Sequence, residues 1–149
     1  MTATIEERLR RLEHLEEIRD LLTAYGRLLD ERDLAGYAEL FARNGTWTGP
    51  YIGSAEGPAA IQALLEKNLS AVAGEHPAGA HHIMSNMVIE IEGDAAKAWS
   101  RWTYVIPGDA RKPSIALSGH YDDALTREGG RWRFKSRVVS GDLPGVGGS

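Results

Sequence analysis

The stretch IRDLLTAYGRLLDERDLAGYAELFARNGTW, residues 18–47, decides the fold because it holds the end of one helix, a second helix and the start of a strand. The residues up to Asp30 predict one long helix, since apolar side chains from Ile5 to Leu29 recur three and four positions apart and charged residues fill the other face. The charged run from Asp30 to Asp33 ends this pattern. Asp33 is a suitable N-cap, so a short second helix is expected to follow directly.

Glycine and proline divide the region that follows. The second helix is expected to bury Leu34, Tyr37, Leu40 and Phe41. Asn44-Gly45 is expected to end this helix, and a strand is expected to begin at Thr46. A third helix opens at Gly57-Pro58, with proline in its first turn. The apolar face of the third helix consists of Ile61, Leu64, Leu65, Leu69 and Val72.

From His81 onward the chain predicts an antiparallel meander, because turn-forming glycine, proline and aspartate residues separate long β-rich segments. Strands are expected at residues 81–92, 96–106, 114–127 and 131–140. Helices that precede a meander indicate an α+β fold. We expect three N-terminal helices packed in the concave face of a curved, mainly antiparallel sheet, a cone-shaped α+β barrel with a pocket between its layers. Residues 1–140 are expected to form one domain, and residues 141–149 a flexible tail.

The composition argues against several classes of function. A chain of 149 residues with a net charge of −4 fits one domain and does not favour nucleic acid or an anionic membrane. The basic run from Arg131 to Arg137 alternates with Trp132 and Phe134, which is typical of a strand with one charged face. The absence of cysteine excludes disulfides and thiolate chemistry. No signal-peptide pattern and no apolar stretch of spanning length is present, so a cytoplasmic protein is expected.

Asp30 and three histidines are the candidates for chemistry. An acid at the C-terminal end of a helix is mildly unfavourable beside the helix dipole, so Asp30 is either an ordinary exposed acid or a functional one. His81 and His82 are neighbours in a strand and must point to opposite faces, and their spacing does not choose between them. His120 follows Gly119, which indicates a bulge or a close approach by another group. Functional and structural roles are equally open for His120.

Motifs for metal, phosphate and serine-nucleophile chemistry are missing. The sequence has no His-x-His, Glu-x-x-His or HExxH pattern, no glycine-rich phosphate loop and no Gly-x-Ser-x-Gly. We therefore expect neither a metal nor a cofactor. Acid/base chemistry by side chains, or plain binding of a ligand, remains.

Three segments together resemble the SnoaL-like branch of the nuclear-transport-factor-2-like superfamily. They are residues 18–47, HHIMSNMVIEIEGDAAKAWS at residues 81–100, and SGHYDDALTREGGRWRFKSR at residues 118–137. The resemblance covers nearly all of residues 5–140. Within this branch the chain is similar to the cofactor-independent dehydratases and dehydrohalogenases, among them the scytalone dehydratases, bile-acid 7α-dehydratases and γ-hexachlorocyclohexane dehydrochlorinases.

The resemblance implies roles for single residues. Asp30 matches the family's aspartate at the end of the first helix, and His82 matches its catalytic histidine through the His-x-x-x-Asn spacing to Asn86. The implied catalytic residues are His82, Asp30, Tyr25 and Arg137. The expected substrate contacts are His120, Trp47, Met84 and Trp102. The second tyrosine of the scytalone dehydratases is expected between Trp47 and Tyr51, where the register is open.

The implied activity is that of a cofactor-independent lyase, which removes water or halide by β-elimination from a small hydrophobic cyclic or aromatic substrate. In such a pair a neutral histidine takes the proton, while the carboxylate fixes its tautomer and stabilises the imidazolium. A non-catalytic ligand-binding or assembly module and a polyketide-cyclase-like isomerase are the alternatives. Trp99 lies on the face of its strand opposite to Trp102 and Tyr104, so an apolar outer face predicts a homodimer or homotrimer.

Overall fold

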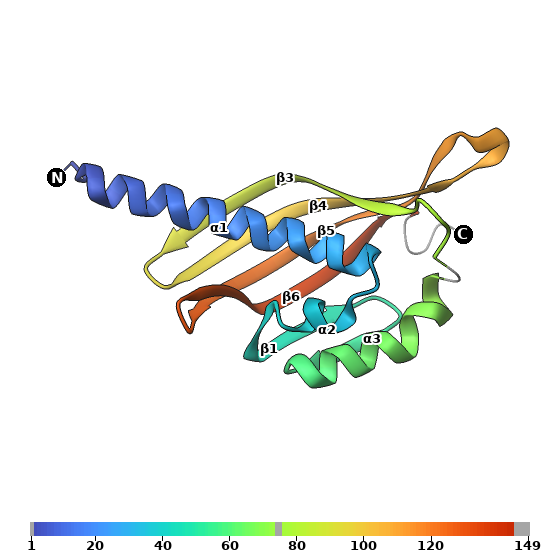
Figure 1. The fold of residues 1–149 in the computed structure, drawn as a ribbon, viewed down its shortest axis with the longest axis horizontal. Coiled ribbons are helices and arrows are strands. Elements are labelled where there is room, and N and C mark those ends of the chain that lie inside the picture. Colours follow the sequence, from blue (N-terminus) through green and yellow to red (C-terminus); the bar gives the residue numbers. More distant parts are fainter. Residues whose placement is uncertain (1, 74–75, 145–149) are drawn as a thin grey trace.

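The chain forms an open, curved sheet with helices on one face (Figure 1). The computed structural model describes residues 2–73 and 76–144. The helices are α1 (Ile5–Asp30), α2 (Leu34–Ala38) and α3 (Pro58–Ala73). The strands are β1 (Phe41–Gly49), β2 (Gly53–Glu56), β3 (His81–Glu92), β4 (Ala95–Pro107), β5 (Pro113–Glu128) and β6 (Arg131–Leu143). A short 3-10 turn, Asp109–Arg111, lies between β4 and β5.

The sheet has six strands in the order β2-β1-β6-β5-β4-β3. Only β1 and β6 pair in parallel among the described strands, and every other pair is antiparallel. The predicted α+β class and mainly antiparallel sheet are confirmed, as are the four long strands to within a few residues. Because β2 and β3 are the two edges, the sheet curves around the helices without closing on itself.

Helix α1 begins with a capping box in which Thr4 and Glu7 each accept a hydrogen bond from the other's backbone N–H. Burial begins only in its C-terminal part, where Ile18 and Leu22 are fully covered by the sheet. The apolar stripe predicted from Ile5 onward is exposed in its first turns, because the helix extends past the sheet there (Figure 1). The sheet therefore holds the end of α1 firmly, and that end carries Asp30.

The second helix is shorter than predicted. It ends at Ala38, and strand β1 begins at Phe41, before the Asn44-Gly45 pair that was expected to close the helix. Phe41 is only 1% exposed and lies opposite Phe134 of β6. Pairing with β6 and burial of this ring outweigh the helical pattern of the local sequence. Residues 53–56 also form a short strand, β2, that was not predicted.

Strand β3 contains a bulge that changes which residues face the helices. The register against β4 shifts between Ser85 and Val88, and Asn86 there has a φ of 53°. Asparagine tolerates this left-handed conformation better than most residues. His82 and Met84 are partly buried as their shared parity predicts, but beyond the bulge Met87 is partly buried and Val88 is 57% exposed.

The bulge predicted at Gly119 is confirmed by a register shift between Ser118 and Gly119 against β6. A Cβ on Gly119 would lie 1.9 Å from the carbonyl oxygen of Ser140 and 2.6 Å from the indole of Trp102. We expect Gly119→Ala to lower the free energy of unfolding by about 3 kcal/mol, because backbone must move. Gly141→Ala, opposite Gly119 with nothing within 4 Å of its Cβ position, is the control and should change stability by less than about 0.5 kcal/mol. Urea unfolding of both variants measures the difference, and equal effects would contradict the close packing.

Residues 141–143, predicted as the start of a C-terminal tail, are instead the end of β6, which pairs with β5 as far as Leu143. Residues 145–149 of that tail lie outside the described residues, as does the side chain of Val72 in the predicted apolar face of α3.

None of the helices described is long and apolar enough to cross a membrane. Trp99 points to the face of β4 opposite to Trp102, as predicted, and the homodimer or homotrimer stays a prediction.

Candidate functional site

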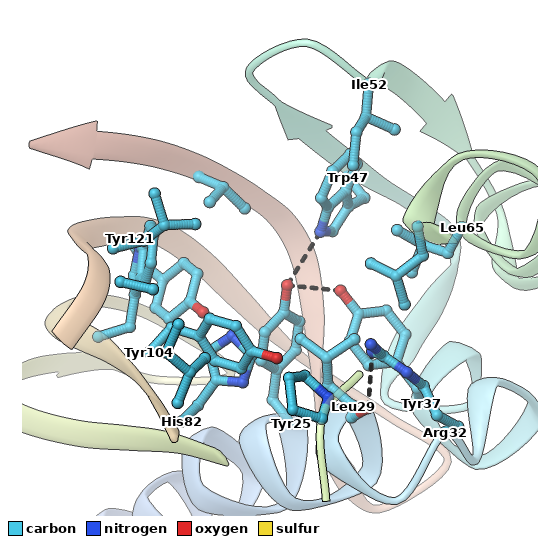
Figure 2. Close-up of a pocket in the computed structure, with 17 residues that line it drawn as sticks. Tyr25, Leu29, Arg32, Tyr37, Trp47, Ile52, Leu65, His82, Tyr104 and Tyr121 are labelled. Carbon is cyan, nitrogen blue, oxygen red and sulfur yellow. Dashed lines mark hydrogen bonds between the residues drawn. The ribbon is translucent and has the colours of Figure 1, made fainter. Parts of the chain in front are cut away.

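A cavity of about 290 Å³ lies between the helices and the concave face of the sheet. Its wall is mostly aliphatic and aromatic, with a few polar groups (Figure 2). The lining consists of Tyr25, Leu29, Arg32, Tyr37, Trp47, Ile52, Leu65, Leu69, Pro77, His82, Trp102, Tyr104, Ile106, Ala116, Leu117, Tyr121 and Val139. An apolar cavity with a few convergent polar groups is the usual form of a small-molecule site.

His82, which lines this cavity, forms a close pair with Asp30. The Nδ1 atom of His82 lies 2.6 Å from Oδ1 of Asp30, and the backbone N–H of His82 donates to Oδ2 at 2.8 Å. Both side chains are mostly buried, with 14% of the His82 side chain and 17% of the Asp30 side chain exposed. The last residue of α1 and the second residue of β3 are therefore held together by both carboxylate oxygens. This double contact fixes the carboxylate relative to the ring.

The contact also fixes the tautomer of His82. A carboxylate accepts hydrogen bonds, so Nδ1 carries the proton and Nε2 keeps its lone pair in the neutral ring. Nε2 makes no hydrogen bond to any described residue, and the ring lines the cavity beside Tyr104, 4.7 Å away between ring centres. His81 lies on the exposed face of β3, where its Nδ1 is 2.9 Å from the carbonyl oxygen of Gly79. The geometry leaves a base facing the cavity.

Two phenols and an indole form a second polar group in the wall (Figure 2). The hydroxyl oxygens of Tyr25 and Tyr37 are 2.5 Å apart, and Nε1 of Trp47 donates to the Tyr25 oxygen at 3.0 Å. An indole N–H can only donate, and one phenol proton lies between the two oxygens. The other phenol proton has no acceptor among the described residues. The network can therefore offer one hydrogen bond to a ligand in the cavity.

Burial keeps the phenols of Tyr37 and Tyr121 protonated. Desolvation raises the pKa of Tyr37 well above its ordinary value, and the contact with Tyr25 raises it further. Desolvation likewise raises the pKa of Tyr121 well above its ordinary value. A phenol with a raised pKa stays a neutral hydrogen-bond donor through the physiological range.

Arg137 lies behind this wall and does not line the cavity. Its guanidinium donates to both oxygens of Asp123, each at 2.7 Å, and both side chains are fully buried. The guanidinium carbon also lies 4.0 Å from the ring centre of Tyr25 and 3.8 Å from that of Tyr121. Direct contact with a departing group, as the resemblance implies, is not what this geometry shows. Arg137 instead supports the two tyrosines from beneath by cation–π contact.

The four residues expected to contact a substrate divide into two pairs. Trp47 and Trp102 line the cavity. Met84 does not line it, because its side chain packs against Gly26 of α1. A Cβ added to Gly26 would lie 3.2 Å from the Met84 side chain. His120 lies on the opposite face of the sheet, where its Nδ1 is 2.9 Å from Asp142 and its ring stacks on Trp99. The expectation that Met84 and His120 face this cavity is corrected.

The sequence did not reveal several residues of the wall. The phenol that contacts Tyr25 is Tyr37 of α2, whereas Tyr51, in the segment where a second tyrosine was expected, is 78% exposed. Tyr37 was assigned only to an apolar helix face, and its spacing of twelve from Tyr25 gives no local signal. Tyr104 and Tyr121 come from strands whose inward faces could have been predicted from their alternation.

Metal ligation receives no support from the described side chains. None of them form a group of three or more His, Cys, Asp or Glu placed to hold a metal ion. The site as described consists of a carboxylate-oriented imidazole, a phenol–indole network and one guanidinium in an apolar wall. Such a set can take a proton from one atom of a ligand and donate a hydrogen bond to another.

This fold and site define a class of small α+β proteins that enclose a ligand cavity beneath a curved sheet. A family model described as a SnoaL-like domain matches residues 10–138, so the chain belongs to the SnoaL-like family. A comparison with curated proteins found no match.

Solved structures share the fold over most of their length. An NTF2-like protein with a cystatin-like fold from Novosphingobium aromaticivorans is 25% identical with a TM-score of 0.81, covering 98% of this chain and 95% of that one. LinA is 20% identical with a TM-score of 0.76, covering 95% and 97%. A candidate scytalone dehydratase from Novosphingobium aromaticivorans is 24% identical with a TM-score of 0.70, covering 89% and 87%. The predicted resemblance to the SnoaL-like branch is thereby confirmed.

Proposed function

We propose that the protein is a cofactor-independent lyase that removes water or halide from a small hydrophobic ring compound by β-elimination. The observation that carries the proposal is the Asp30–His82 pair, with Nε2 of His82 left free at the wall of an apolar cavity. One of the structures similar to this chain is that of a candidate scytalone dehydratase, whose name is that of an enzyme that removes water, and this is consistent with such chemistry.

The reaction needs one base and one hydrogen-bond donor. Nε2 of His82 takes a proton from the carbon adjacent to the carbon that bears the leaving group, and the C–H electron pair becomes the new C=C bond between these two carbons. The leaving group departs with its bonding pair, and the proton on the imidazolium can return to it or to water. Asp30 stabilises the imidazolium while it exists. The free phenol proton of the Tyr25–Tyr37 pair donates to a carbonyl or leaving-group oxygen on which charge develops.

The alternative functions are a non-catalytic binding or assembly module and a cyclase-like isomerase. Large side chains filling the cavity would favour a module, but about 290 Å³ stays open and Met84 packs outside it. An isomerase would use the same histidine to take and return a proton. The product distinguishes the two, because the product of an isomerase has the same molecular formula as its substrate, whereas the product of a lyase has lost water or hydrogen halide.

A panel of two-ring β-hydroxy ketones tests the proposal. A suitable member is 3-hydroxy-1-tetralone, from which loss of water and tautomerisation give 1-naphthol, with its own absorbance and fluorescence. We expect water loss at a rate above that of buffer for at least one member. Binding without any turnover across the panel would contradict the lyase and favour the binding module.

The phenol network gives a further prediction. Tyr25→Phe should lower kcat by about 10²–10³, because it removes the hydroxyl that contacts both Tyr37 and Trp47. Tyr51→Phe is the matched control, since this exposed phenol does not line the cavity and its loss should leave kcat unchanged. Initial rates on the best substrate of the panel measure both. Equal rates for Tyr25→Phe and the unchanged protein would remove the network from the mechanism.

A further inference from the structure

Arg32 is the one formally charged residue among the described residues that line the cavity. It belongs to the turn between α1 and α2, two residues after Asp30, and is partly exposed. Figure 2 shows its guanidinium reaching from this turn toward Leu29 and Tyr37. The cation therefore lies at the solvent side of an apolar wall, where a ligand in the cavity can meet it.

The backbone at Arg32 gives no reason of its own for an arginine. Its φ is 61°, in the left-handed region where glycine is favoured and a long side chain costs conformational energy. The side chain makes one weak hydrogen bond, from Nη1 to the carbonyl oxygen of Leu29 at 3.3 Å. No described carboxylate lies within 4 Å of the guanidinium. Arg32 thus has a strained backbone, and its guanidinium makes only one weak hydrogen bond at the wall of a cavity. A ligand that binds the guanidinium best explains this arrangement.

Nearby charges do not account for Arg32. The carboxylate of Asp30 already accepts two hydrogen bonds from His82 and forms no ion pair with Arg32. Burial lowers the pKa of His76, and the Arg32 charge lowers it further. The cation is thus close enough to act on His76, and it disfavours a second positive charge there. Four of the five guanidinium N–H bonds stay available for an anion.

We propose that Arg32 selects ligands that combine an apolar body of about two rings with a carboxylate, which it binds at the solvent side of the cavity. The proposal names the substrate class of the site for which elimination is proposed, and it rests on that cavity being the binding site. An engineered cavity of about 150 Å³ holds benzene. The cavity of about 290 Å³ here has room for two fused rings. The carboxylate at Arg32 then orients the ring between His82 and the Tyr25–Tyr37 pair.

A charged probe and its neutral counterpart test this directly. Titration calorimetry measures the affinity of the protein for 2-naphthoate and for 2-naphthamide, which share the ring system and differ in charge. The net charge of −4 gives no general attraction for anions, so a preference for the carboxylate must come from a local cation. We expect naphthoate to bind about tenfold more tightly or better, since charge-assisted hydrogen bonds to a guanidinium are strong. Equal affinities, or no binding of either probe, would overturn the proposal.

Variants of Arg32 show whether it is the source of the preference. In Arg32→Gln the preference should fall to about one while naphthamide affinity changes less than about twofold, because the charged group is lost and a neutral polar side chain stays in its place. Arg32→Gly should fold at least as well, since glycine suits the positive φ, and should also lose the preference. Arg8→Gln removes the same charge from the exposed first part of α1 and should keep the preference. A preference that survives Arg32→Gln and Arg32→Gly would overturn the proposal.

The binding assay is independent of turnover. His82→Ala should keep the preference for naphthoate, because Arg32 supplies it. If no substrate is turned over but the preference is present and depends on Arg32, the ligand class stands and the elimination fails. If turnover depends on His82 but neutral and anionic probes bind equally, the elimination stands and the role of Arg32 fails.

Discussion

His82→Ala should lower kcat by about 10²–10⁴ on any substrate that the unchanged protein eliminates, because it removes the only base placed at the cavity wall among the described residues. Asp30→Asn should lower kcat to a similar extent, since an amide can hold the imidazole in the wrong tautomer and cannot stabilise the imidazolium. Initial rates from the ketone panel measure both variants. Both should keep the fold, as judged by circular dichroism.

The chain offers a matched control for each change. His81→Ala removes the neighbouring histidine, which points to the exposed face of β3, and should leave kcat unchanged. Asp33→Asn removes a charge three residues from Asp30 and keeps the N-cap of α2, because asparagine caps as well as aspartate. If His81→Ala and His82→Ala have the same effect, the proposed base is wrong.

The second large effect concerns stability. Asp123→Asn should lower the free energy of unfolding by about 3–5 kcal/mol, because it leaves the fully buried Arg137 without its carboxylate partner. Arg137→Met should cost a similar amount by leaving Asp123 buried and unpaired. The double variant Asp123→Asn/Arg137→Met should be less destabilised than the sum of the two, since no unpaired charge is left inside. Urea unfolding of the four proteins measures these differences.

Asp122→Asn is the control for this cycle. Asp122 is adjacent in β5, but its side chain is 62% exposed and its nearest partner is His120 at 3.5 Å. Its loss should change stability by less than about 1 kcal/mol, as is usual for exposed pairs. If Asp123→Asn lowered the free energy of unfolding as little as Asp122→Asn does, the Asp123–Arg137 pair would not be what holds the guanidinium against Tyr25 and Tyr121.

Much of the fold follows from local patterns. The apolar spacing predicted α1, the Gly57-Pro58 pair predicted α3, and the turn residues predicted the ends of the long strands to within three residues. The errors fall where long-range pairing outweighs local preference. Phe41 continues a helical pattern but lies in β1, which pairs with β6. The bulge at Asn86 changes which residues of β3 face the helices, and no glycine marks its place in the sequence.

The site could be predicted only in part, for a similar reason. Asp30 and His82 are 52 residues apart, and without the structure only the resemblance to a family predicts that they form a pair. Arg137 was expected at the substrate because an arginine in a family position suggests contact with a ligand. Its partner Asp123 lies directly opposite on β5, and this cross-strand pairing, which no local pattern reveals, draws the guanidinium behind the tyrosines.

Exchange of acidic C–H protons for deuterium tests the central claim most directly, because it needs a base but no leaving group. The ring protons next to the carbonyl of 2-tetralone, a two-ring ketone, can be followed by proton NMR in D₂O. We predict exchange above the buffer rate with the unchanged protein and with His81→Ala, and exchange at the buffer rate with His82→Ala. Binding of 2-tetralone without accelerated exchange, or equal acceleration by His82→Ala, would contradict a base at His82.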